Sequence, residues 1–426
     1  MKLWDKGTPL HSLVESFTVG DDYLLDRELL PYDCRATASH ARALEKTGIL
    51  TRGEVEKIDA ALQDAQGIEI LREHEDCHTA LEEFLTARLG DLGKKIHAGR
   101  SRNDQVMAAL TLWTREHLLR TGGELLSLCD GLNEFARRNE LSMPGYTHMQ
   151  RAMPSSVPLL FGSYLESLLE DLELLHGAFR VINRNPLGSA AGYGTSLGLD
   201  RELTAEELAF EGVRNCILVQ ARPRLMAVAL MPLTFIMKTL ERMASDLLLF
   251  TMEEFGFFSL PDGLTTGSSI MPQKKNYDIL ELVRARSALV HGYAHEVDML
   301  GIRLTSGYHR DFQLTKRPVL EAFAETMNCL AMMRLIVSEL SADPDAMRKA
   351  LTPELFAADR ACELVKQGVP FREAYRSVAA GLDELSVPGS IIPERCHLQF
   401  RDYRGEIDRY RKLHEALGEG KKSPSR

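Results

Sequence analysis

The chain has 426 residues, 44% of them hydrophobic, and its 51 Lys and Arg against 61 Asp and Glu give a net charge of −10. This length and composition support two or three domains with buried cores and exclude general disorder. The absence of a basic cluster excludes nucleic acid as the main ligand, because phosphate binding needs clustered cations. No signal peptide is apparent, and no segment approaches the roughly 18 apolar residues of a membrane span, so we expect a cytoplasmic protein without membrane partners.

The first region of note is the segment His74-Glu75-Asp76-Cys77-His78, which fits the zinc-protease pattern His-Glu-x-x-His. That pattern is short, and no third ligand stands at a suitable spacing, so we expect no metal. Seven cysteines are scattered through the chain without a Cys-x-x-Cys pair, which predicts reduced structural thiols.

Five long runs of apolar residues at helical spacing follow, over residues 104–140, 161–179, 230–247, 277–300 and 320–330. In the first run, Leu118, Leu125 and Leu132 recur every seven residues, a spacing typical of a bundle seam. Alternating strand patterns are scarce. We therefore predict an all-α fold in which a long central bundle over 99–345 is flanked by smaller helical domains over 1–98 and 346–426. The apolar surface exceeds what one chain can cover, which favours partner subunits. Residues 418–426 look like a frayed tail.

Two polar motifs interrupt these runs. His97-Ala98-Gly99-Arg100-Ser101-Arg102-Asn103-Asp104-Gln105 combines two arginines with a helix start, which suits carboxylate binding or a capped helix with surface ion pairs. The second motif lies between two bundle helices and contains His148; it reads Pro144-Gly145-Tyr146-Thr147-His148-Met149-Gln150-Arg151-Ala152. This histidine either acts as a general acid or base, or is simply a polar residue on the surface. The glycine-rich stretch 187–194 lacks a following lysine, so we interpret it as a linker or substrate loop and not a phosphate loop.

The most informative motif is Gly267-Ser268-Ser269-Ile270-Met271-Pro272-Gln273-Lys274-Lys275-Asn276, a polar loop before a helix start. Such a loop can deliver hydroxyl, ammonium and amide groups to a substrate anion near a helix N-terminus.

This loop resembles the signature of the fumarase/aspartase superfamily, and the two polar motifs together with it resemble the argininosuccinate lyase family in particular. The resemblance covers residues 32–376 and implies reversible, cofactor-free elimination of argininosuccinate to arginine and fumarate. It also implies a homotetramer whose active sites are each assembled from several subunits.

The same resemblance implies roles for individual residues. Ser268 matches the general base, His148 the group that protonates the leaving nitrogen, and Glu281 a carboxylate that tunes this histidine. Lys274 and Asn276 match groups that bind the carboxylate on which charge develops. The remaining matches are to substrate-binding positions, namely Ser101, Arg102, Asn103, Thr147, Tyr308, Gln313, Lys316 and the segment that ends in His78.

The chain also departs from the family. His309 and Arg310 stand where Asn and Lys are common, Leu314 and Thr315 replace an acidic pair, and Tyr277 replaces a proline. The common serine is missing from residues 17–22, and the alignment of Arg222 is ambiguous. Contacts to the arginine half are therefore open, and two alternatives remain: another fumarate-releasing lyase, or a crystallin-like structural tetramer with little activity.

Overall fold

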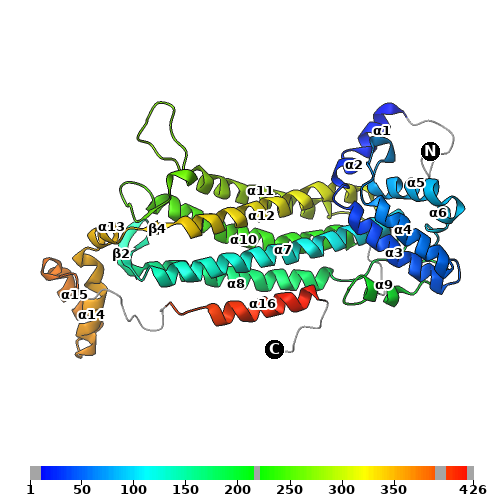
Figure 1. The fold of residues 1–426 in the computed structure, drawn as a ribbon. Coiled ribbons are helices and arrows are strands. Elements are labelled where there is room, and N and C mark those ends of the chain that lie inside the picture. The colour runs from blue at the N-terminus through cyan, green and yellow to red at the C-terminus, as the bar shows by residue number, and fades with distance from the viewer. Residues whose placement is uncertain (1–10, 215–220, 389–399, 420–426) are drawn as a thin grey trace.

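The computed structural model describes residues 11–214, 221–388 and 400–419. Long helices lie side by side in a bundle, with a group of shorter helices at each end (Figure 1). The predicted all-α architecture with a long central bundle is confirmed.

The N-terminal group packs around α3, which contacts α4, α5 and the first bundle helix α7. α4 starts where it does because Thr51 and Glu54 form a reciprocal capping box. The elements of this group are α1 (Ser12–Val19), α2 (Asp22–Leu25), α3 (Leu30–Lys46), α4 (Arg52–Ala65), η1 (Arg72–His74), α5 (Cys77–Leu89) and α6 (Asp91–Lys95).

The bundle helices correspond one to one with the five predicted runs. They are α7 (Arg102–Arg138), α8 (Val157–Ile182), α10 (Arg222–Phe250), α11 (Asp278–Leu300) and α12 (Lys316–Glu339). A capping box starts α7: the Ser101 hydroxyl accepts from the Asn103 N–H at 3.3 Å, and the Asp104 carboxylate accepts from the Ser101 N–H at 2.9 Å.

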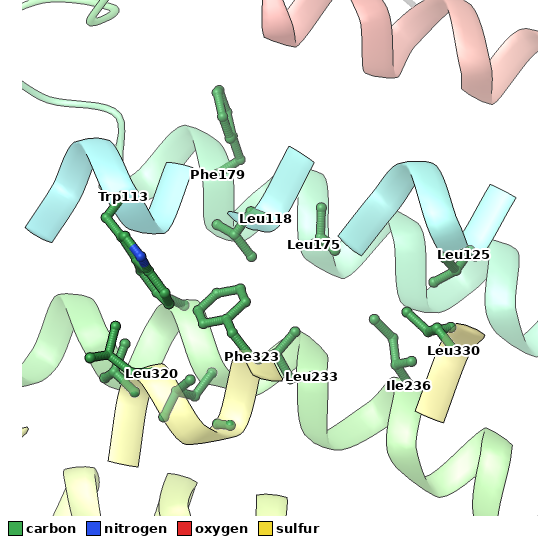
Figure 2. Close-up of a cluster of buried hydrophobic side chains, with 14 of the residues drawn as sticks. Trp113, Leu118, Leu125, Leu175, Phe179, Leu233, Ile236, Leu320, Phe323 and Leu330 are labelled. Carbon is green, nitrogen blue, oxygen red and sulfur yellow. The ribbon is translucent and has the colours of Figure 1, made fainter. Parts of the chain in front are cut away.

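Leucine, isoleucine and aromatic side chains of α7, α8, α10 and α12 form a buried cluster within the core of the bundle (Figure 2). Leu118 and Leu125 of α7 are completely buried, and Trp113 meets Phe323 of α12 edge to face with ring centroids 5.3 Å apart. Each such leucine stabilises the fold by about 1.5–3 kcal/mol through removal from water. The seven-residue spacing thus marks the seam that was predicted.

A β-hairpin joins α7 to α8 and was not predicted. Pro144 and Gly145 lie in its first strand, and both are poor strand formers, so the sequence read as a loop. The elements between the bundle helices are β1 (Ser142–Thr147), β2 (Gln150–Ser156), α9 (Arg201–Glu207), β3 (Phe258–Ser259), η3 (Asp262–Leu264), η4 (Arg310–Thr315) and β4 (Ser341–Ala342). β1 pairs with β2, and β3 with β4, both antiparallel.

The C-terminal residues occupy two places. α13 to α15 lie at the hairpin end of the bundle, whereas α16 returns along α7 and α8 (Figure 1). There, Nε2 of His414 in α16 donates to the Leu119 carbonyl at 2.7 Å, and Gly122 leaves the space that the histidine ring needs. These elements are α13 (Pro344–Ala350), η5 (Pro353–Phe356), α14 (Ala357–Lys366), α15 (Phe371–Ala380), η6 (Leu382–Glu384) and α16 (Arg404–Gly418). The bounds of the three domains stay a prediction. Residues 420–426 of the predicted tail lie outside the described residues.

The expectation that no segment is long and apolar enough to span a membrane is corrected by α10. α10 is long and apolar enough, by length and composition alone, to cross a membrane, although 56% of the relevant window is buried in the bundle. It packs against α8, α11 and α12, which accounts for its hydrophobicity. The described cysteines are free, as predicted; they are Cys34, Cys77, Cys129, Cys329 and Cys362, while Cys216 and Cys396 lie outside the described residues.

Candidate active site

The residues singled out from the sequence form two groups at opposite ends of the bundle. Arg102 begins α7, and the hairpin that carries His148 follows the other end of that helix. A helix of 37 residues is about 55 Å long at about 1.5 Å per residue. One chain therefore does not bring the two groups together.

The first group surrounds a cavity of about 440 Å³ beside the N-terminal helices. It contains all the predicted substrate-binding residues from the start of α7 and from the segment before α12. The lining residues are Asp22, His74, Glu75, Asp76, Thr79, His97, Arg100, Ser101, Arg102, Asn103, Val106, Arg222, Tyr308, Arg310, Gln313 and Lys316. Two motifs more than 200 residues apart in the sequence thus share one wall.

Ion pairs fix the charged groups of this cavity in place. Lys316 is 1% exposed, and its Nζ lies 2.8 Å from Asp22 and 2.5 Å from Asp26. Burial opposes its charge, but Asp26 and Asp22 outweigh burial and raise the pKa of Lys316. Arg102 forms an ion pair with Asp76. Burial would raise the pKa of Asp76, but the charge of Arg102 outweighs burial and lowers this pKa to about 2. Both cations are therefore held by carboxylates before any substrate arrives.

His78 lies behind the cavity wall and does not line it. Its Nδ1 is 2.8 Å from the Asp33 carboxylate, and both side chains are fully buried. Burial favours the neutral acid, but His78 outweighs it and lowers the pKa of Asp33. The predicted contact of His78 with substrate stays a prediction.

The zinc-protease pattern does not form a site. His74 ends η1 and accepts the Leu71 N–H, Glu75 has a positive φ of 68°, and His78 lies in the next helix, α5. The two imidazoles therefore do not share a helix face. Within the described residues, Asp26, Cys77 and His78 have ligand atoms within 4.8 Å of one another, but the Lys316 ammonium already neutralises Asp26.

Of the departures at residues 277, 309, 310, 314 and 315, only Arg310 lines the cavity. It donates to Gln313 at 3.0 Å and to the Thr18 carbonyl at 2.8 Å, and Gln313 itself donates to the Thr18 and Val19 carbonyls at 3.1 Å. Leu314 is 63% exposed, and the remaining departures, His309, Thr315 and Tyr277, are also absent from the lining.

The glycine-rich stretch 187–194 supports the start of α7. The Asp104 carboxylate accepts a hydrogen bond from the Ala190 N–H at 2.9 Å. Burial raises the pKa of Asp104 to about 6, although the hydrogen bond from the Ser101 N–H works to lower it. Gly188, Gly192 and Gly194 all have positive φ, which only glycine adopts without strain. The linker interpretation therefore fits, and the stretch helps to fix the arginine motif.

The second group begins with His148 at the tip of the hairpin. Thr147 pairs with Gln150, so His148 and Met149 are the two central residues of the turn, with φ of 52° and 62°. Turns of this geometry normally carry Asn and Gly, because other side chains are strained at positive φ. Both side chains are exposed. The hairpin thus presents the imidazole to the outside of the chain.

The Ser268 loop is closed by a bridge between Thr266 and Asn276. The Ser268 hydroxyl oxygen accepts the Met271 N–H at 3.2 Å and the Ile270 N–H at 3.4 Å. The Asn276 amide donates to the Gly267 carbonyl at 3.2 Å, while Lys274 is exposed. Two backbone donors aimed at one hydroxyl oxygen are suited to stabilise an alkoxide.

Glu281 lies in the first turn of α11 and is exposed. No hydrogen bond or ion pair joins it to His148 within the part of the chain that the structure describes. Sequence reasoning missed the carboxylates Asp22, Asp26 and Asp33, whose partners stand far away in the chain. No local pattern marks them, since each is one of many acidic residues in the first helices.

Comparison with known proteins identifies the class. A family model described as "Lyase" matches residues 12–292. A solved structure of an EDDS lyase variant with bound fumarate has a TM-score of 0.82 at 21% identity, covering 97% of this chain and 93% of its own, which shows the shared fold. The fold and the loop motifs are those of a lyase of the fumarase/aspartase superfamily.

Curated relatives narrow the assignment. The argininosuccinate lyase of Sorangium cellulosum is 42% identical over 394 residues, which cover 90% of this chain and 91% of the relative. That of Thermotoga neapolitana is 42% identical over 387 residues, covering 89% and 97%. The chain belongs to the argininosuccinate lyase family.

Proposed function

We propose that the protein is an argininosuccinate lyase that reversibly cleaves argininosuccinate to arginine and fumarate in arginine biosynthesis. The observation that carries this proposal is 42% identity over nine tenths of the chain to enzymes of that name, together with an intact Ser268 loop. No cofactor enters the proposal, because acid, base and charge-stabilising groups suffice for the elimination.

In the proposed reaction, Ser268 acts as an alkoxide that removes a Cβ proton from the succinyl half. The Ile270 and Met271 N–H groups support the oxygen in its charged form. The electron pair of the broken C–H bond spreads into the adjacent carboxylate, where Lys274 and Asn276 offset the charge. That pair then forms the Cα–Cβ double bond of fumarate as the C–N bond breaks. The electrons of the C–N bond pass to the guanidinium nitrogen, and His148 donates the proton that releases arginine.

We also propose a homotetramer in which several subunits build each site. The separation of the cavity from His148 and Ser268 supports it, because a second copy running in the opposite direction would carry these groups to the cavity. Large apolar side chains left exposed along α10 and α11 would be covered in such an assembly; they are Met231, Phe235, Leu282, Leu289 and Met299.

A substrate panel tests the proposal. The purified protein is incubated separately with argininosuccinate, adenylosuccinate and aspartate, and fumarate formation is followed by absorbance. Turnover of argininosuccinate alone is expected. Preference for another substrate would identify a different lyase of the superfamily, and a folded tetramer inert toward all three would identify a structural protein. Light scattering on the same sample reports the oligomeric state.

A further inference from the structure

The C-terminal helix α16 lies along α7 and α8, and polar contacts hold it there (Figure 1). Tyr410 donates to the Glu173 carboxylate of α8 at 2.9 Å, and Arg411 pairs with Asp130 of α7 at 2.5 Å. Both members of the Arg411 pair are partly exposed. A further contact is formed by two histidines, on the side of α16 that faces the bundle.

His176 of α8 and His414 of α16 form a hydrogen-bonded pair. Nε2 of His176 lies 3.1 Å from Nδ1 of His414, and the two rings are stacked with their centroids 5.3 Å apart. His176 is only 4% exposed. On its other side, the His414 ring donates from Nε2 to the Leu119 carbonyl of α7 at 2.7 Å. Two hydrogen bonds in series therefore join α8, α16 and α7.

The partners of the two rings determine where their hydrogens lie. A carbonyl oxygen only accepts, so Nε2 of His414 carries the hydrogen that reaches Leu119. Nδ1 of a neutral His414 is then an acceptor, and His176 donates to it from Nε2. A proton added to His414 turns this acceptor into a second donor, and a proton added to His176 creates a cation in a buried site. The contact is therefore complete only while both rings are neutral.

Gly122 of α7 provides the space in which the His414 ring lies. A Cβ atom at position 122 would be 2.4 Å from Cε1 of His414 and 2.9 Å from its Nδ1, which is closer than these atoms can approach. A glycine inside a helix is less favourable than an alanine. The long helix α7 thus loses some stability at this position, and the loss is what allows α16 to dock closely.

Burial and nearby charges disfavour protonation of the docked pair. Burial, followed by the charges of His414 and Arg180, lowers the pKa of His176 to about 3. Burial also lowers the pKa of His414, although the Leu119 carbonyl and Glu415 oppose it. When α16 is released, both rings meet water and their pKa returns toward about 6.5. The released state then binds more protons than the docked state, so docking weakens as the pH falls below about 6.5.

We propose that α16 is an acid-released strap, which the pair of His176 and His414 fastens to α7 and α8 while both rings are neutral and which protonation of the pair detaches. Release exposes Ile407, Tyr410 and Leu417, which are buried in the docked helix, together with the surface that they cover. Acid thus uncovers an apolar face that is hidden at neutral pH. This inference does not depend on the proposed enzymatic function.

Hydrogen exchange measures how firmly α16 is held. Peptides from residues 404–418 of the full-length protein are followed by mass spectrometry at pH 7.5 and 5.5, and each rate is compared with the intrinsic rate at that pH to give a protection factor. Protonation of one released histidine weakens docking by about tenfold between these pH values, so protection of α16 should fall by about 100-fold for the pair. Peptides from α12 in the same sample are the reference and should keep their protection.

A double glutamine variant keeps the hydrogen bonds and removes the titration. In His176→Gln with His414→Gln, the amide of residue 414 can donate to the Leu119 carbonyl while its oxygen accepts from the amide of residue 176. Protection of α16 should stay at the parental level at pH 7.5 and no longer fall at pH 5.5. The carboxylates that bind α16 elsewhere are unchanged in this variant, so a fall that they cause would persist; they are Glu166, Glu173 and Asp130.

Matched controls accompany each change. Gly122→Ala places a Cβ atom against the His414 ring and should lower the protection of α16 at pH 7.5 without any change of charge. Gly123→Ala is its control, because a Cβ atom at position 123 meets nothing within 4 Å, and it should protect α16 as the parent does. For the histidine exchange the control is His11→Gln, which changes an exposed residue before α1 and should show the parental fall.

Three results would overturn the proposal. The first is a protection of α16 that stays the same at pH 7.5 and 5.5, and the second is a fall of parental size in the double glutamine variant. The third is an equal loss of protection in α12, which would show acid unfolding of the whole bundle. Should the double variant fail to hold α16 at pH 7.5, His176→Gln alone decides, because it keeps the bond from His414 to Leu119. Its fall should be about tenfold, and a fall of about 100-fold would contradict the pair.

Discussion

The two ends of the bundle differ in how their polar groups are held. At the cavity end, Lys316 and Arg102 are fixed by carboxylates, and the glycine-rich stretch braces the start of α7. At the hairpin end, His148 and Lys274 are exposed, and Ser268 is held by its own loop. A single chain thus contains a cavity wall whose charged groups are fixed and, a helix length away, the groups that we propose for chemistry.

From this difference between the two ends of the bundle, we expect the largest loss of turnover when Ser268 is replaced. Ser268→Ala should lower turnover by about 10²- to 10⁴-fold, because a proton-transfer group is lost, while substrate binding and the melting temperature stay near the parent. Steady-state kinetics and calorimetry measure the two separately. The control is Ser269→Ala, which changes the neighbouring exposed serine. If Ser268→Ala turned over substrate as fast as this control, Ser268 would not be the base.

The next prediction concerns the assembly. Inactive His148→Asn and Ser268→Ala proteins, unfolded together and refolded as a mixture, should regain activity if the two residues of one site come from different chains. Random mixing gives about a quarter of the sites both intact residues. Each variant refolded alone is the control. Mixtures that exchange subunits, as shown by a tag, and yet stay inactive would place both residues in one chain.

A smaller effect is expected at the cavity. Arg102→Lys keeps the charge but loses the planar donor, so KM should rise about tenfold with little change in kcat, as for the loss of one charge-assisted hydrogen bond. Arg88→Lys is a matched control, since Arg88 forms an exposed ion pair with Asp64 at 2.6 Å. An unchanged KM in Arg102→Lys would indicate that Arg102 serves only its pair with Asp76.

Stability near the cavity end should depend on pH. His40 is 1% exposed, and burial, followed by the charge of Arg100, lowers the pKa of His40 to about 3. Below its usual pKa the unfolded chain takes up a proton that the folded chain refuses, so stability falls as the pH decreases from about 6.5 toward 3. The slope from this one group is about 1.4 kcal/mol per pH unit.

Urea unfolding at a series of pH values measures that slope, and His40→Gln should remove it. At pH 8 the histidine is neutral in both states, so a comparison there isolates the loss of packing. A variant whose slope equals that of the parent would show that other groups cause the acid sensitivity.

The sequence predicted the bundle well because each long helix buries one stripe, so that Leu118 and Leu125 recur at a spacing that is visible locally. The arginine and serine motifs could also be singled out from the sequence, since each is a short continuous segment, and their roles stay predictions. Sequence reasoning missed the hairpin, where pairing with Pro154 and Met153 overrides the poor strand preference of Pro144 and Gly145. It also missed the pairing of Lys316 with Asp26, because 290 residues separate the partners.

The turn at His148 and Met149 has a consequence for anyone who engineers this chain. Selection for heat resistance would favour Asn and Gly at these two positions, because they relieve the strain of left-handed backbone. The same exchange would delete the imidazole. This tip is therefore a place where directed evolution for thermal tolerance would remove the proton donor that we propose, and it should be held constant in any such library.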